Sequence, residues 1–311
     1  DKFKFIFEKS GVDYKIMRRI LQMKLTMDGR RVPTIMTNQK NDGDDDKNFF
    51  LRSLISYGII GFFAMFAIIA PFGMFFKMSI CLGMIMFMIT TTMIADFSTV
   101  LLDIKDKNIL MSKPIDSRTV NMAKIMHIFI YISIVTSVVA GPSMIAGTIK
   151  HGLYFFIIFF ICLLLSTAFI IFLTSMLYAL VLNFFDGEKL KDIINYVQIM
   201  LSIILLVGYQ FVGRMFDIFD YDAVFNPKWW TYIIPPAWFA APFSVLIEND
   251  FGSHYIYLSI LGIVVPIISL VIYVNVIIPY FEKNLSKLNN NSSKKDRFND
   301  LKRAYRRMIS K

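Results

Sequence analysis

The stretch Leu153–Phe185 reads LYFFIIFFICLLLSTAFIIFLTSMLYALVLNFF and contains no charged residue in 33 positions. As a helix it would measure about 50 Å, well over the roughly 30 Å of hydrocarbon in a bilayer. It therefore predicts a membrane-spanning helix that tilts or extends beyond the bilayer.

The composition of the whole chain agrees with a membrane location. Of 311 residues, 56% are hydrophobic and 18% are charged, whereas roughly 25% of the residues in a soluble domain are charged. A soluble globule has too little interior to hold so many apolar side chains. The composition predicts an all-α integral membrane protein and weighs strongly against a soluble enzyme.

Six apolar blocks are long enough to cross a bilayer as helices. Pro142 and Pro266 lie inside the third and the sixth block, where they predict kinks. The six expected transmembrane helices are Phe50–Phe72, Met78–Leu102, Ile125–Ile149, Leu153–Phe185, Ile193–Phe216 and Tyr255–Phe281.

The distribution of Lys and Arg predicts the orientation of these helices. If both termini are cytoplasmic, 29 basic residues lie on the inner side and four on the outer side. Cytoplasmic segments are enriched in Lys and Arg, so this distribution places the N and C termini inside. It also accounts for the net charge of +10 without nucleic acid as a partner. The four outer residues are Lys77, Lys150, Arg214 and Lys228.

Three regions follow from this topology: a cytoplasmic N-terminal region (1–48), a six-helix transmembrane domain (49–283) and a basic cytoplasmic tail (284–311). Within the first, Val12–Leu25 predicts a basic amphipathic helix that lies on the inner membrane surface. Its expected apolar side carries Ile16, Ile20, Leu21 and Met23, and its expected basic side carries Lys15, Arg18, Arg19 and Lys24.

The loop after the second expected helix is the most informative cytoplasmic feature. Acidic and basic residues alternate from Asp103 to Lys107, Pro114 then breaks the chain, and Asp116 or Ser117 can cap the next helix. A short helix here would suit a soluble partner, and a simple solvated connector explains the same residues equally well.

The outer segment Asp217–Asp250 is rich in Trp, Tyr and Pro and contains all three tryptophans of the chain. The adjacent prolines Pro235 and Pro236 predict short re-entrant or interfacial helices instead of one long helix. With Trp238 they form a candidate outer gate. An aromatic anchor at the membrane surface is the alternative of equal weight.

Other polar residues of the expected helices give weaker signals. Asp96 lies near the cytoplasmic end of the second helix, where it either lines an inner pathway or sits at the interface. Cys81 and Cys162 lie in apolar blocks and are expected to be buried free thiols. The histidines His127, His151 and His254 show no metal-ligand spacing, so we expect no metal site and ordinary interfacial histidines.

Three segments resemble the permease subunits of ABC-2 type exporters. They are GVDYKIMRRILQMKLTMDGRR (Gly11–Arg31), LLDIKDKNILMSKPIDSRTVNMAKI (Leu101–Ile125) and IPPAWFAAP (Ile234–Pro242). Their order matches the family, and together with the six-helix topology the resemblance covers most of residues 11–283.

This resemblance implies a membrane subunit of a bacterial ATP-driven exporter in the plasma (inner) membrane. The partners would be an ABC ATP-binding subunit, a second copy of this permease or a related one, and membrane lipid. ATP and Mg would bind to the partner subunit. The implied contacts with that subunit are the coupling loop (Asp103, Lys105, Asp106, Lys107, Asn108), a second cytoplasmic contact (Asp186, Glu188, Lys189) and the elbow helix (Arg18, Arg19, Lys24).

The chain has no G-x-x-x-x-G-K-[ST] phosphate-binding loop, so we expect ATP hydrolysis on another polypeptide and no enzymatic activity in this one. Two other classes stay open, namely a secondary transporter driven by an ion gradient and a non-transporting membrane scaffold. No residue set identifies a substrate, and peptide, lipid, drug and polysaccharide are all compatible with the sequence.

Overall fold

The computed structural model describes residues 7, 11–30, 49–101, 116–184, 196, 199–200, 203 and 229–277. Most of these residues are helical, and no strand occurs among them. The principal helices are α2 (Tyr14–Arg30), α3 (Phe49–Ile69), α4 (Met74–Leu101), α6 (Ser117–His151), α7 (Leu153–Phe184), α9 (Pro235–Ile247) and α10 (Ser253–Ile272). The 3-10 helix η2 (Trp229–Ile233) precedes α9, and the π-helical segment η3 (Tyr273–Ile277) follows α10.

Four helical segments are long and apolar enough to cross a membrane, which indicates a membrane-embedded, all-helical protein. They are Met74–Ile94, Met126–His151, Leu153–Leu180 and Ser253–Ile277, and they coincide with the second, third, fourth and sixth expected helices. At the first expected helix, α3 has 21 residues, and the part of it whose side chains the structure describes forms the apolar helix Leu54–Ile69. Most of the fifth expected helix lies outside the described residues.

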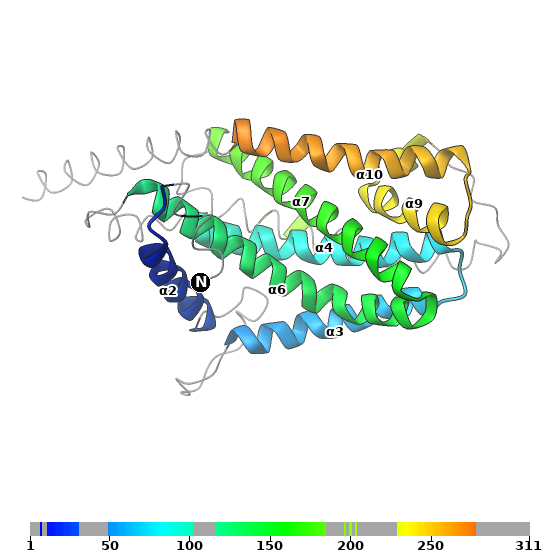
Figure 1. Cartoon of the computed structure of the whole chain (residues 1–311), viewed down its shortest axis with the longest axis horizontal. Coiled ribbons are helices and arrows are strands. Elements are labelled where there is room, and N and C mark those ends of the chain that lie inside the picture. Colours follow the sequence, from blue (N-terminus) through cyan, green and yellow to red (C-terminus); the bar gives the residue numbers. More distant parts are fainter. Residues whose placement is uncertain are drawn as a thin grey trace, which may run out of the picture.

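The long helices run alongside one another, and the bundle has two distinct ends (Figure 1). The helix α2 lies at the end where α3 and α6 begin, which we call the α2 end. At the opposite end, short turns join α3 to α4, α6 to α7 and α9 to α10, and we call it the turn end. Gly152 alone separates α6 from α7 and has φ +84°, a conformation that suits glycine.

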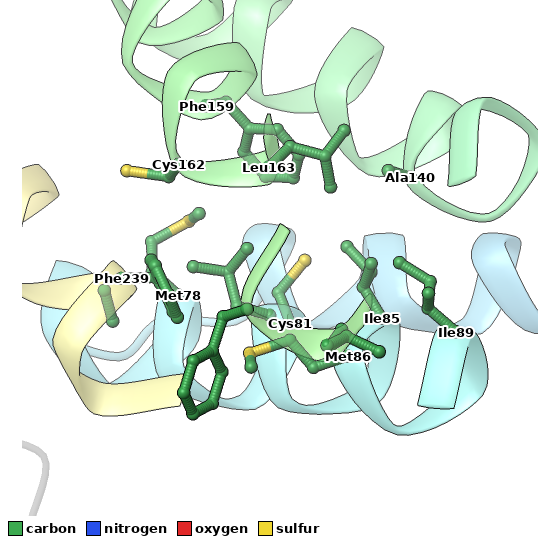
Figure 2. Close-up of a cluster of buried hydrophobic side chains, with 14 of the residues drawn as sticks. Met78, Cys81, Ile85, Met86, Ile89, Ala140, Phe159, Cys162, Leu163 and Phe239 are labelled. Carbon is green, nitrogen blue, oxygen red and sulfur yellow. The ribbon is translucent and has the colours of Figure 1, made fainter. Parts of the chain in front are cut away.

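The core of the bundle is formed by apolar side chains from α3, α4, α6, α7, α9 and α10. In Figure 2, the α4 residues Met78, Cys81 and Ile85 lie beneath Phe159, Cys162 and Leu163 of α7. Ala140 of α6 and Phe239 of α9 join the same cluster. Outside this core, α3, α7 and α10 carry many exposed Phe, Ile and Leu side chains. Such outward apolar faces suit a lipid environment.

The two prolines expected to kink helices lie within continuous helices, Pro142 in α6 and Pro266 in α10. The last helix departs from expectation at its end, because the α-helical pattern stops at Ile272 and η3 continues as a π-helix. Short π-helical segments add a residue to a helical turn and are frequent at functional sites. The sequence analysis did not predict this change.

Candidate functional site

The helix α9 is the predicted short helix of the outer segment. Pro235 and Pro236 occupy its first turn, where proline costs no hydrogen bond because the first amide groups of a helix lack an intrahelical acceptor. Its 13 residues measure about 20 Å, which is less than the roughly 30 Å needed to cross a bilayer. The expectation of short helices at this point is confirmed.

The helix α9 does not lie on the outside of the bundle. It packs chiefly against α4 and α10 and also contacts α7, and its central residues Phe239, Ala240 and Ala241 are buried. In its C-terminal half, the ring of Phe243 contacts Phe155, with ring centroids 5.2 Å apart. A helix too short to cross the membrane is thus enclosed by longer ones.

Trp238, one of the predicted gate residues, connects the start of α9 with η2 and with α7. Its indole Nε1–H donates a 2.9 Å hydrogen bond to the carbonyl of Tyr232 in η2, and its ring packs edge-on against Phe169 of α7. Its side chain is half-buried, as are Pro235 and Pro236. By contrast, Trp229 is 76% exposed. The tryptophans therefore have different environments, and Trp238 is part of the packed bundle.

The backbone of α9 comes very close to α10. A Cβ atom added to Gly262 would lie 2.5 Å from the carbonyl oxygen of Trp238, a distance that real Cβ atoms do not show. At Gly83 of α4, the same addition would meet Pro236 at an ordinary 3.6 Å. The contact between α9 and α10 therefore depends on a glycine at position 262.

A group of charged and polar side chains gathers at the turn end, and we call it the turn-end cluster. It consists of Lys77 from α4, Lys150 and His151 from α6, and Glu248 from the end of α9. The Glu248 carboxylate accepts a 3.0 Å hydrogen bond from the Met74 amide and so caps the start of α4. Lys77 is only 7% exposed.

This cluster is not expected from the sequence, which predicts Lys77 and Lys150 as separate outer charges and His151 as an ordinary interfacial residue. One signal was available, because consecutive transmembrane helices are antiparallel, so the start of the second and the end of the third meet at the same membrane face. Glu248 joins the cluster because α9 packs beside α4, and nothing in the sequence predicts that packing.

The predicted elbow helix exists as α2, and it packs against α6 at the α2 end. Met17 and Ile20 are buried together with Ala123 of α6. Two backbone amides at the start of α2, those of Lys15 and Ile16, donate to the Asp13 carboxylate. This N-cap fixes the point where the helix begins.

The predicted faces of α2 need one correction. Arg18 and Arg19 are exposed as expected, but Lys24 is only 6% exposed and lies on the packed side, whereas Met23 is 44% exposed. At 100° per residue, position 24 falls close to position 17 on the helix surface, while position 23 is turned away from it. Lys24 is therefore not part of the outward basic face.

Several predicted site residues lie outside the described residues or have side chains that do. The coupling-loop residues Asp103, Lys105, Asp106, Lys107 and Asn108 belong to the first group, as do Asp186, Glu188 and Lys189 of the second cytoplasmic contact. Asp96 lies in α4, and its side chain is among those not described. The structure does bear out the helix start expected at Asp116 or Ser117, because α6 begins at Ser117.

Both cysteines are buried and free, as expected. The expectation for the histidines is wrong at one position, since His127 is buried within the bundle at 3% exposure. In the described part of the chain, no three His, Cys, Asp or Glu residues are placed to share a metal ion.

No protein-family model, curated protein or solved structure matches this chain.

Proposed function

We propose that this chain is the transmembrane permease subunit of an ATP-driven exporter of the ABC-2 type. It forms the translocation pathway with a second permease subunit, in the plasma membrane of a bacterium. A separate ATP-binding subunit hydrolyses ATP on the cytoplasmic side. The six-helix topology with both termini cytoplasmic is part of this proposal.

The observation that carries the proposal is the position of α9. A helix about 20 Å long, opened by two prolines, lies among longer helices directly before the last of them. Glu248, the residue that follows α9, accepts a hydrogen bond from the Met74 amide at the start of α4, at the turn end. A short helix held in this way supports a role as a movable closure at the outer end of a pathway.

The arrangement of α4 and α6 supports a contact between this chain and a separate ATP-binding subunit. The helix α4 ends and α6 begins at the α2 end of the bundle (Figure 1). The segment that joins them in the sequence holds Asp103–Asn108, the coupling-loop residues of the family resemblance. The amphipathic α2 packs on the first turns of α6.

The helix α6 offers a direct mechanical link between the two ends. It has 35 residues and is therefore about 50 Å long. Its first turn follows the coupling loop, and its last turn carries Lys150 and His151 beside Glu248. A shift of the ATP-binding subunit would tilt α6 and so displace the end of α9.

Reversal of one adjacent charge pair tests the proposal. In proteoliposomes that contain both subunits, the double variant Asp106→Lys, Lys107→Asp should retain ATP hydrolysis but lose ATP-dependent transport. The matched control is Asp46→Lys, Lys47→Asp, which reverses a similar pair in the N-terminal linker. Unchanged transport in the first variant, or equal loss in both, would contradict the coupling role.

A further inference from the structure

The turn-end cluster contains a lysine in an unusual position. Lys77 lies in the first turn of the membrane-spanning segment Met74–Ile94. A lysine at a helix end ordinarily extends its side chain into water, yet the Lys77 residue as a whole is only 7% exposed. Burial of a charged group in a membrane segment is costly, and such residues usually serve a function.

The described residues do not neutralise the Lys77 ammonium by direct contact. Its charged neighbours are Lys150 and Glu248, and no ion pair or hydrogen bond joins its ammonium to any of the residues that the structure describes. The second positive charge, on the exposed Lys150, adds a repulsion that water partly screens.

The two acidic groups of this end each accept a hydrogen bond from a backbone amide. Glu248 accepts from Met74 at 3.0 Å, and Asp250 accepts from Gly252 at 3.0 Å. The donors are less well satisfied. Lys150 reaches the Ile68 carbonyl at a long 3.5 Å, and the Nε2 atom of His151 is buried with no partner within the described ranges.

We infer that Lys77, Lys150 and His151 form a binding site for a phosphate-type oxyanion at the turn end of the bundle. Three donors from two helices match an anion with several acceptor oxygens, and lysine binds phosphate as a point charge. Glu248 is a positioning residue that holds the start of α4 and limits the net positive charge. The ligand is a phospholipid head group or a soluble phosphate, which share this chemistry.

This inference is independent of the exporter proposal, and its test requires no transport. The full chain, purified in detergent and stripped of lipid, is titrated by calorimetry with two probes, inorganic phosphate and dihexanoyl phosphatidylglycerol. Binding of the lipid alone identifies a head-group site, binding of phosphate alone identifies a soluble ligand, and binding of both identifies a site open to either. Binding of neither probe overturns the inference.

Variants assign the binding to these residues. Lys77→Gln and Lys150→Gln should each weaken binding about tenfold or more, because each removes a charge-assisted contact. Lys15→Gln, a matched change on the exposed face of α2, should leave it unchanged. Glu248→Gln should tighten binding a few-fold, because it removes a negative charge and keeps an acceptor for the Met74 amide.

Two results would contradict the site. One is wild-type affinity in Lys150→Gln, and the other is weaker binding in Glu248→Gln, because loss of a negative charge should favour an anion bound beside it. Circular dichroism and gel filtration show whether each variant is folded. If Lys77→Gln does not fold, Lys150→Gln decides, because Lys150 is exposed and its loss leaves the packed core intact.

Discussion

Replacement of Gly262 by alanine tests the packing of α9 directly. The added methyl group would lie 2.5 Å from the Trp238 carbonyl oxygen and 3.0 Å from its carbonyl carbon. Both atoms belong to the backbone of α9, so no side-chain rotation relieves the clash. The two helices must separate by about 0.9 Å to reach the 3.4 Å of an ordinary contact.

The matched control is Gly83→Ala in α4. Its methyl group would meet Pro236 of the same short helix at 3.6 Å, which is an ordinary contact. Either change improves helix propensity by about 1 kcal/mol, and this gain cancels when the two variants are compared. What remains is the overpacking cost at position 262, about 1–3 kcal/mol.

The assay is equilibrium unfolding in mixed detergent micelles, followed by tryptophan fluorescence. All three tryptophans lie between positions 229 and 238, so the signal reports on η2 and α9. We expect Gly262→Ala to unfold at a lower denaturant concentration than Gly83→Ala. Equal free energies of unfolding, within a few tenths of a kcal/mol, would refute the close approach of α9 and α10.

Three further outcomes follow from individual contacts. Trp238→Phe should destabilise the fold by about 1 kcal/mol, because it leaves the Tyr232 carbonyl without the indole donor; thermal unfolding measures this loss. Asp13→Ala should cost about 1 kcal/mol through loss of the cap on α2, seen as faster amide exchange confined to that helix. Cys81 and Cys162 should resist a polar maleimide until the chain is denatured, because both thiols are buried, and mass spectrometry counts the modified sites.

The long helices could be predicted because their apolar length alone determines them. The helix α7 begins at Leu153, the residue expected from the sequence, since the uncharged stretch starts there. The presence of a short helix at α9 could be predicted, because Pro235 and Pro236 cannot lie in the interior of a long, uninterrupted helix. Its enclosure by α4, α7 and α10 could not, because composition does not distinguish a buried short helix from one on the membrane surface.

Two errors have physical causes. The charge of Lys24 predicts a place on the basic face of α2. Its position, seven residues after Met17, instead puts it on the same side of the helix as Met17. The turn-end cluster as a whole could not be predicted because its members come from three segments that are far apart in sequence. Lys77 and Glu248 are brought together only when α9 passes beside α4, a tertiary contact that no local pattern contains.

The central claim is that this chain works with a separate ATP-binding subunit. Its most direct test is purification of the chain from its native membrane in mild detergent, with mass spectrometry of the proteins that accompany it. The account predicts a stoichiometric soluble ATPase that carries a G-x-x-x-x-G-K-[ST] phosphate-binding loop. Reproducible absence of such a subunit, with the chain intact, would contradict the exporter assignment and favour a secondary transporter or a membrane scaffold.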